Sequence, residues 1–309
     1  MNCDHVFDGG ICLDCDEKIA CELCDINPWE TRCDECDSGR ICDNCYVFCD
    51  ICNRTICTAC EYCSCQQKSN KKELDIEFSD KEYSWKNMSL SEFLSEDNVP
   101  SGWTEFFQSP EVQSRLTQIS SDLDADRQEY TIYPEINQVF RAFYATPLNR
   151  VRVVLVGQDP YHNGSAVGLC FSVKPGNTIN PSLKNIYREL ENSGFTPNYS
   201  GNLTHWAKQG ILLLNTALTV QAGSPESHMC HWYEFSKLLI KYIGKTLGNR
   251  VQWLLFGRPA FDLVTKILGK QENMLVTTHP SPLGANKSAS FGPAFLGSRV
   301  FEKIHGITW

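Results

Sequence analysis

The stretch Val151–His162, VRVVLVGQDPYH, decides the fold. Its first six residues are mostly valine or leucine, and the apolar run ends abruptly at Gly157. A short β-branched run bounded by glycine and proline is typical of a strand buried on both faces, as in a parallel sheet. The loop that follows carries an amide, a carboxylate, a phenol and an imidazole. Loops at the carboxyl ends of parallel strands are where α/β proteins place their chemistry.

Three further apolar runs share this design. They cover residues 211–214, 251–256 and 274–278, and Asn215, Gly257 and His279 mark their carboxyl ends. Helical patterns separate the runs, so the sequence predicts an α/β fold with helices on both faces of a parallel sheet. Since the carboxyl ends of parallel strands open on one edge, we expect a carboxylate, an amide and an imidazole to converge in one crevice.

Four stretches carry a helical pattern of apolar residues. Pro110 opens the first helix, residues 136–143 form the second, Asn180–Gly194 the third, and residues 232–243 the fourth. In the third, Asn180 suits the N-cap, proline follows at the first helical position, and glycine suits the C-terminal cap.

Cysteine and charge both divide the chain near residue 65. Of the 17 cysteines, 15 lie at or before Cys65; residues 1–65 hold 14 acidic against 4 basic residues, and the remainder 23 against 24. We therefore predict a cysteine-rich module at 1–65, a polar linker at 66–84 and a larger domain at 85–309. No apolar run approaches the roughly 18 residues that span a membrane, and the N-terminus lacks the pattern of a secretory signal. An intracellular protein without a membrane partner is expected.

The cysteine-rich module carries six Cys-x-x-Cys pairs, a spacing at which two thiolates bind one tetrahedral zinc ion. The alternative is a disulfide scaffold, which requires an oxidising compartment and leaves one of the 15 cysteines unpaired. Zinc would supply most of the folding free energy of so short a segment. Its spacing resembles that of RING and B-box modules, which bind other proteins or act as ubiquitin ligases. The sixteen candidate zinc ligands are Cys3, His5, Cys12, Cys15, Cys21, Cys24, Cys33, Cys36, Cys42, Cys45, Cys49, Cys52, Cys57, Cys60, Cys63 and Cys65.

The polar residues at the strand ends favour nucleobase chemistry. Asp159 can orient water or stabilise a developing cation, and His279 can donate a hydrogen bond to a developing anion. Asn215 offers the donor and the acceptor that an amide-like ring requires, and Phe171 offers a stacking face. Taken singly, each has a structural reading, as a turn former, a helix cap or a buried histidine. The chain lacks the motifs for dinucleotide, phosphate-loop and serine-hydrolase chemistry. Cleavage of an N-glycosidic bond is among the options left.

Three motifs resemble those of the main, uracil-specific family of uracil-DNA glycosylases. They are GQDPYH at 157–162, LLLNT at 212–216 and HPSPL at 279–283, in that family's order and spacing, and the likeness covers roughly 85–309. The resemblance implies a central four-stranded parallel sheet flanked by helices and hydrolysis of uracil from DNA, leaving an abasic site. It also implies that catalysis needs no metal or organic cofactor and that the catalytic domain is a monomer.

The resemblance also implies roles for individual residues. Asp159 would position the attacking water and stabilise the cationic sugar, and His279 would hydrogen-bond to uracil O2. Asn215 would read the uracil edge, Tyr161 would exclude the thymine methyl, and Phe171 would stack on the base. Gln158 joins these three as a substrate-binding residue. The implied DNA-binding residues are Ser182, Gly257, Arg258, Pro280, Ser281 and Leu283, of which Leu283 is the wedge that enters the duplex.

Three departures from that family stand out. Gly284 replaces a common serine, which predicts a more flexible intercalating loop. Arg258 also replaces a common serine, and either a phosphate contact or a solvated side chain fits it. The loop after His162 is one residue short, with Val167 at a position where histidine is frequent.

Two other functions fit the same sequence. The larger domain could be a DNA tether or processivity component that has lost activity, although Asp159, Asn215 and His279 are all present. Alternatively, the zinc module could carry the main role as a ubiquitin-ligase-like adaptor. In the leading reading, uracil removal by the larger domain, the module is expected to bind an unknown protein partner.

Overall fold

The computed structural model divides the chain into two compact units, Met1–Glu77 and Phe78–Trp309. It describes six short strands within residues 1–82, and residues 83–95, 98–174 and 176–309. In the first unit the strands pair as antiparallel hairpins: β1 (Phe7–Asp8) with β2 (Ile11–Cys12), β3 (Thr31–Arg32) with β4 (Arg40–Ile41), and β5 (Tyr46–Phe48) with β6 (Thr55–Cys57). The predicted zinc ligation requires side chains that lie outside the described residues.

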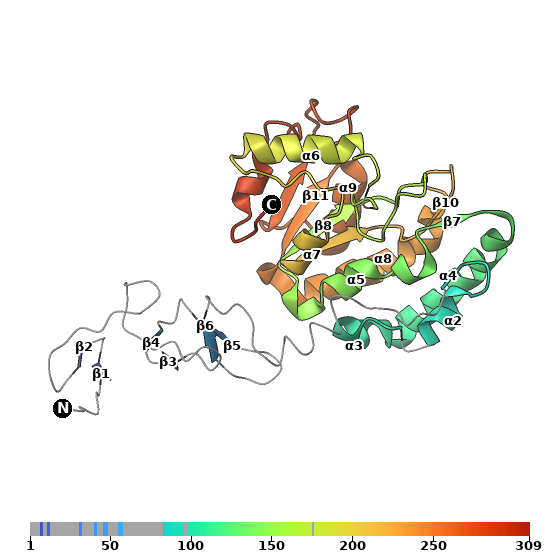
Figure 1. Ribbon diagram of the computed structural model, residues 1–309, viewed down its shortest axis with the longest axis horizontal. Helices are drawn as coiled ribbons and strands as arrows, with labels where there is room; N and C mark the ends of the chain where they lie inside the picture. The colour runs from blue at the N-terminus through green and yellow to red at the C-terminus, as the bar shows by residue number, and fades with distance from the viewer. Residues whose placement is uncertain are drawn as a thin grey trace. The chain divides into compact units, whose positions relative to one another are not determined.

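The second unit is built on a four-stranded sheet in the order β12-β11-β8-β9, and every neighbouring pair is parallel. Its strands are β8 (Val153–Gly157), β9 (Ile211–Asn215), β11 (Gln252–Phe256) and β12 (Met274–Thr277). Helices flank this sheet (Figure 1). A separate antiparallel pair joins β7 (Ile132–Tyr133) to β10 (Val220–Gln221). The predicted parallel four-stranded sheet is therefore confirmed.

Helices connect and cover these strands. The α-helices are α2 (Leu90–Ser95), α3 (Thr104–Phe107), α4 (Pro110–Glu129), α5 (Arg141–Ala145), α6 (Pro181–Asn192), α7 (Thr204–Lys208), α8 (Met229–Leu247) and α9 (Arg258–Leu268). The 3-10 helices are η1 (Ser101–Trp103), η2 (Ile136–Gln138), η3 (Leu148–Arg150), η4 (Gly248–Arg250) and η5 (Val300–Lys303). None of the helices in the described part of the chain has the length and apolar character needed to cross a membrane.

One predicted helix and one strand boundary need correction. Residues 136–143 do not form one helix but the 3-10 turn η2 and the start of α5, because Phe140 (φ −100°, ψ 20°) departs from helical geometry. Asn180 occupies the N-cap of α6, as predicted, but its side chain makes no capping hydrogen bond. The predicted strand at 151–156 begins two residues later, at Val153.

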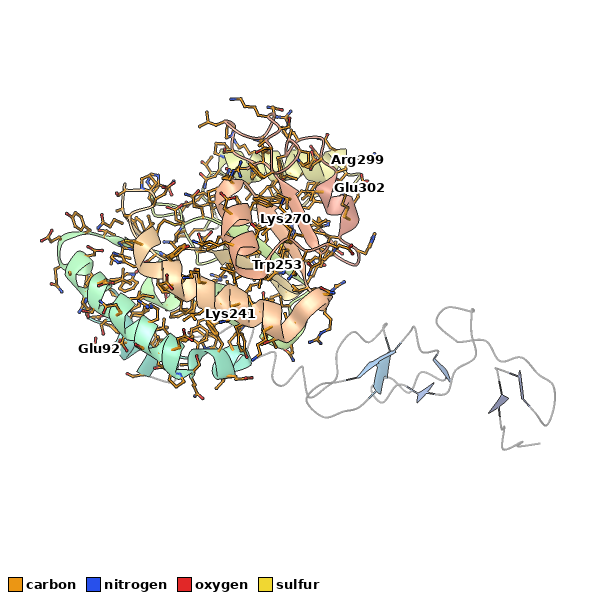
Figure 2. All side chains as sticks on the ribbon, turned by 180° about the vertical axis from the view of Figure 1, so that it is seen from behind. Glu92, Lys241, Trp253, Lys270, Arg299 and Glu302 are labelled. Atoms are coloured by element: carbon orange, nitrogen blue, oxygen red, sulfur yellow. The ribbon has the colours of Figure 1, made fainter. Side chains whose placement is uncertain are left out.

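The interrupted helix still buries its apolar residues, because aromatic packing holds them. Phe107 meets Phe140 and Phe143 edge to face, with ring centroids 5.2 Å apart in both pairs. Phe143 also packs against Phe235 of α8. Trp253, on the central strand β11, is fully buried within the same unit (Figure 2). The burial predicted from the apolar spacing therefore holds where the regular helix does not.

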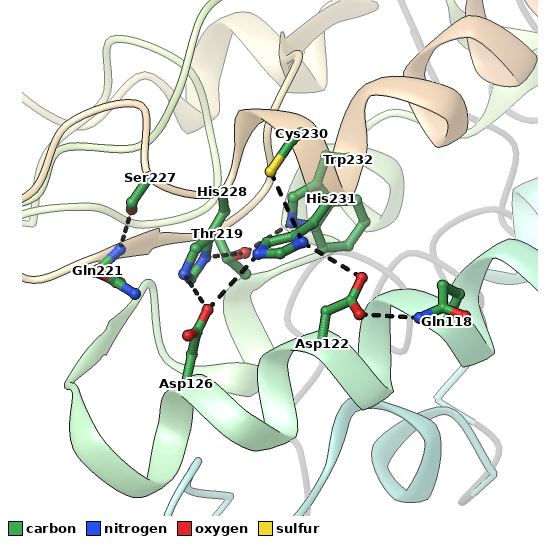
Figure 3. Close-up of polar contacts among 10 residues, drawn as sticks. All are labelled: Gln118, Asp122, Asp126, Thr219, Gln221, Ser227, His228, Cys230, His231 and Trp232. Carbon is green, nitrogen blue, oxygen red and sulfur yellow. Dashed lines mark hydrogen bonds and ion pairs between the residues drawn. The ribbon is translucent and has the colours of Figure 1, made fainter.

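A polar network joins α4 to the start of α8 (Figure 3). His228 is fully buried, and its Nε2 lies 3.1 Å from Oδ2 of Asp126. His231 Nδ1 lies 3.3 Å from Oδ2 of Asp122. Burial, the largest influence, lowers the pKa of His228 to about 4, and the Asp126 carboxylate opposes this shift only in part. His228 is therefore neutral at pH 7.

This neutral histidine predicts an acid-sensitive fold. Between pH 6.5 and about 4 the unfolded chain binds a proton at His228 that the folded chain does not, so stability falls as the pH is lowered through this range. We expect the free energy of unfolding to drop by roughly 2 kcal/mol at this residue between pH 7.5 and pH 5. Urea unfolding of the full chain, followed by tryptophan fluorescence at both pH values, measures it.

His228→Gln is expected to remove this part of the pH dependence, while the exposed His305→Gln leaves it intact. Equal losses of stability in the wild type and in His228→Gln would show that His228 does not carry the effect.

Candidate active site

The carboxyl ends of the four strands bring the predicted residues to one edge of the sheet. Gly157 and Asn215 are partners in the β8–β9 register. On the other side of β8, Gly257 directly follows the last residue of β11. Its N–H donates to the Thr277 carbonyl at 2.9 Å, and His279 lies two residues beyond Thr277. The predicted convergence of these strand ends is therefore observed.

Gly157 is required by the side chain of Asn215. A Cβ atom at residue 157 would lie 2.4 Å from Asn215 Oδ1, so only glycine leaves room for the amide. The Thr216 N–H donates to the Gly157 carbonyl at 3.2 Å and fixes the strand ends together. Asn215 is buried, so its orientation is set by packing.

Asp159 is held by a residue that the sequence analysis missed. The backbone N–H of Glu226 donates to Asp159 Oδ2 at 2.7 Å, and the Glu226 carboxylate accepts from Gln158 Nε2 at 2.5 Å. Burial raises the pKa of Asp159; the Glu226 charge acts in the same direction, whereas the Glu226 N–H and His162 oppose it. Glu226 lies 67 residues from Asp159 in a segment without a motif, so nothing in the sequence pointed to it.

His279 is oriented by the loop that follows it. The Ser281 N–H donates to His279 Nδ1 at 3.1 Å, so in the neutral ring the proton lies on Nε2. Burial lowers the pKa of His279, which favours this neutral form. The site therefore holds an imidazole whose free N–H can donate to an oxygen.

Aromatic rings form another wall of the site. The Phe171 ring lies 6.0 Å from the His279 ring and 6.1 Å from that of Phe256, centroid to centroid. Phe171 adopts φ +61°, a left-handed conformation that is uncommon for a bulky side chain. The Tyr161 hydroxyl donates to the Phe171 carbonyl at 3.4 Å. The strained backbone places the ring beside His279.

A cavity of about 380 Å³ opens at this edge. Among the predicted residues, its lining includes Gln158, Gly257, Arg258, His279 and Ser281. Asp159, Tyr161, Phe171 and Asn215 are not among the residues that line it. Two of them contact the lining: Asn215 lies against Gly157, and Phe171 packs beside His279.

The loop after His279 presents an apolar side chain to solvent. Leu283 is 83% exposed, the largest exposure of any large apolar residue in the described part of the chain. The Thr278 hydroxyl donates to the Gly284 carbonyl at 3.1 Å, and the Gly284 N–H donates to the Ser281 carbonyl at 3.0 Å. A Cβ atom at Gly284 would lie 2.9 Å from the His279 carbonyl oxygen, so this turn is tightly closed around the glycine.

Helix α6 is tied to the same loop. Asn185 Nδ2 donates to the Pro280 carbonyl at 2.8 Å, so helix α6, whose first turn carries Ser182, is connected to the segment that carries His279.

Arg258 makes three contacts. Its guanidinium lies 4.6 Å from the centroid of the Phe291 ring, Nη2 donates to Ser290 at 3.1 Å, and Nη1 lies 3.5 Å from Asp262. The side chain is still 52% exposed. Contact with a phosphate therefore stays a prediction.

No group of three or more His, Cys, Asp and Glu side chains suited to a metal ion occurs in residues 83–95, 98–174 or 176–309. The predicted zinc ligands all precede this part of the chain.

Comparisons with known proteins identify the family of the chain. Residues 143–302 match the family model of the uracil DNA glycosylase superfamily. Curated uracil-DNA glycosylases of Deinococcus deserti and Lacticaseibacillus casei are 38% and 41% identical to the chain, over 67% and 64% of its length and 82% and 83% of theirs.

Solved structures give the same result. The crystal structure of mimivirus uracil-DNA glycosylase superposes with a TM-score of 0.60 at 25% identity, covering 65% of this chain and 80% of that one. Another mimivirus structure, with a TM-score of 0.63 and 25% identity, is a complex with UGI and covers 72% and 90% of the two chains. The chain therefore belongs to the uracil-DNA glycosylase superfamily and is an enzyme of that kind, a hydrolase that acts on N-glycosyl bonds.

Proposed function

We propose that Asp159 and His279 perform the chemical step of uracil removal in DNA repair. The observation that carries this proposal is the Ser281 N–H bonded to His279 Nδ1, because it leaves an Nε2–H donor beside the cavity. As the bond between the sugar and uracil breaks, the base gathers negative charge and the sugar positive charge. A neutral N–H donor suits the uracil O2 oxygen, and a carboxylate suits the cationic sugar and its attacking water.

Base selection rests on three other side chains. The buried Asn215 amide would donate to uracil O4 and accept from N3–H, a pattern that cytosine reverses. Phe171 would stack on the ring, and Tyr161 would close the space around C5 against the thymine methyl. Gln158, bonded to Glu226, would line the same cavity.

DNA binding would use the loops around this cavity. The exposed Leu283 would fill the space left by the extruded base. Ser182 and Ser281 would bind phosphates together with the backbone at Gly257 and Pro280, and Arg258 would add a charged contact.

Replacing Asp159 by Asn tests the chemical role. Loss of the carboxylate is expected to slow uracil release by about 10²–10⁴-fold while the full chain still binds the DNA. The measurement is single-turnover release from a uracil-containing oligonucleotide, with chelator and without added magnesium. Wild-type rates in Asp159→Asn, or no release by the wild type with DNA binding intact, would contradict this role.

Replacing Asn215 by Asp tests base selection. The change removes the amide donor to O4 and supplies an oxygen that can accept from the amino group of cytosine, so we expect slower uracil release and a new release of cytosine. Matched oligonucleotides with uracil or cytosine at one position measure both. An unaltered preference for uracil would show that Asn215 does not read the base.

For residues 1–65 we propose an intracellular zinc module that binds a protein partner. The six Cys-x-x-Cys pairs support it, and the surplus of acidic residues argues against a role in binding phosphates. The adaptor and DNA-tether alternatives gain no support from the described residues.

Metal analysis tests the zinc module. Full-length protein purified under reducing conditions is expected to hold stoichiometric zinc, at most about four ions if each takes four ligands. Chelator should remove the metal without slowing uracil release, because no residue proposed for the chemistry lies in this segment. Protein free of zinc, with its cysteines in disulfide bonds, would support the disulfide scaffold instead.

A further inference from the structure

Glu226 contacts Gln158 and Asp159, the first two residues of the loop 158–162, which is called the catalytic loop below. It does so through its backbone N–H and through its side chain. Its backbone N–H donates to Asp159 Oδ2 at 2.7 Å, and its side-chain Oε1 accepts from Gln158 Nε2 at 2.5 Å. It lies between β10 and α8, outside every motif of the sequence analysis. An exposed glutamate on a connecting segment has no structural need to make both bonds.

The backbone of Glu226 is held in an unfavourable conformation. Its φ is +65°, in the left-handed region that favours glycine. Such strain persists only where the surroundings enforce it, and it concentrates at functional sites. Here the left-handed turn aims the N–H of residue 226 at the carboxylate of Asp159.

Backbone hydrogen bonds hold the segment that carries Glu226 both before and after this residue. The Gly223 N–H donates to the His162 carbonyl at 2.9 Å, and the Met229 N–H donates to the Glu226 carbonyl at 3.1 Å as α8 begins. The catalytic loop is thus anchored to this segment at Gln158, Asp159 and His162.

We propose that Glu226 is a positioning residue for Asp159, fixing its carboxylate through the backbone N–H and locking the neighbouring Gln158 through the side chain. The inference rests on the proposed role of Asp159 and adds the residue that orients it. Its carboxylate also places a second negative charge beside Asp159, where His162 is the opposing titratable group.

That second charge has a measurable consequence. A like charge disfavours ionisation, so Glu226 helps to raise the pKa of Asp159. Because the ionised carboxylate is the active form, removal of the Glu226 charge is expected to move the acid limb of the pH–rate profile to lower pH.

Two substitutions separate the effect of the Glu226 charge from the effect of its side-chain hydrogen bond with Gln158. Glu226→Gln keeps an oxygen that can accept from Gln158 but removes the charge. We expect a plateau rate within about threefold of the wild type and an acid limb moved to lower pH. Glu226→Gly keeps the N–H and suits the positive φ but leaves Gln158 unanchored. We expect its plateau rate to fall about tenfold, because misplaced catalytic groups lose rate.

The experiment is single-turnover uracil release by the full chain from pH 4.5 to 8.5, with thermal melting of each variant. Glu272→Gln is the matched control, since this exposed glutamate precedes β12 at the opposite end of the strands. A Glu226→Gly plateau within twofold of the wild type overturns the proposal, and so does a Glu226→Gln profile that superimposes on it. Asp159→Asn, measured in the same series, distinguishes failure of the Glu226 proposal from failure of the proposed role of Asp159. If Asp159→Asn reacts at the wild-type rate, the proposed role of Asp159 fails as well.

Discussion

The site depends on the close approach of β8 and β9 at their carboxyl ends. At Gly157 the absence of a Cβ atom lets the Asn215 amide lie across the neighbouring strand, where any other residue would bring a carbon within 2.4 Å of its oxygen. The central strand then continues into Gln158 and Asp159, with β11 and β12 on its other side. One glycine therefore sets the spacing between the group proposed to read the base and the group proposed to activate water.

The protonation states of His279 and Asp159 at this edge are set by burial and by backbone hydrogen bonds. Burial lowers the pKa of His279 and so favours its neutral form, and burial raises the pKa of Asp159. The hydrogen bond from the Glu226 N–H opposes the second shift, because it stabilises the ionised carboxylate. A neutral imidazole and an ionised carboxylate are the states that the proposed roles of His279 and Asp159 at opposite ends of the breaking bond require. Both orienting hydrogen bonds come from backbone N–H groups, those of Ser281 and Glu226. The orientation of His279 and Asp159 is therefore set by the path of the backbone more than by neighbouring side chains.

The sequence predicted the parallel sheet and the edge where the site lies, because buried strands and the residues that end them are local signals. It did not predict the interruption at Phe140 or the left-handed turn at Phe171, since both are set by tertiary packing. Glu226 was not predicted either, because its partners Asp159 and Gln158 are 67 and 68 residues away in the chain. The roles of individual site residues came from the family likeness, and the geometry here adds their orientation rather than a test of those roles.

Leu283 extends this reasoning from the chemistry to the DNA. A leucine that is 83% exposed gains nothing from burial in the free protein, so its position makes sense if a partner takes it up. The loop that bears it is closed by Thr278 and Gly284 and linked to α6 through Asn185. In the proposed role of Leu283 as a wedge, a loop already held by these hydrogen bonds would lose little entropy on binding, and more of the energy from burying the leucine would offset unstacking of the extruded base. A Cβ atom at residue 284 would approach the His279 carbonyl oxygen to 2.9 Å, so the closed turn fits the glycine that stands here in place of a common serine.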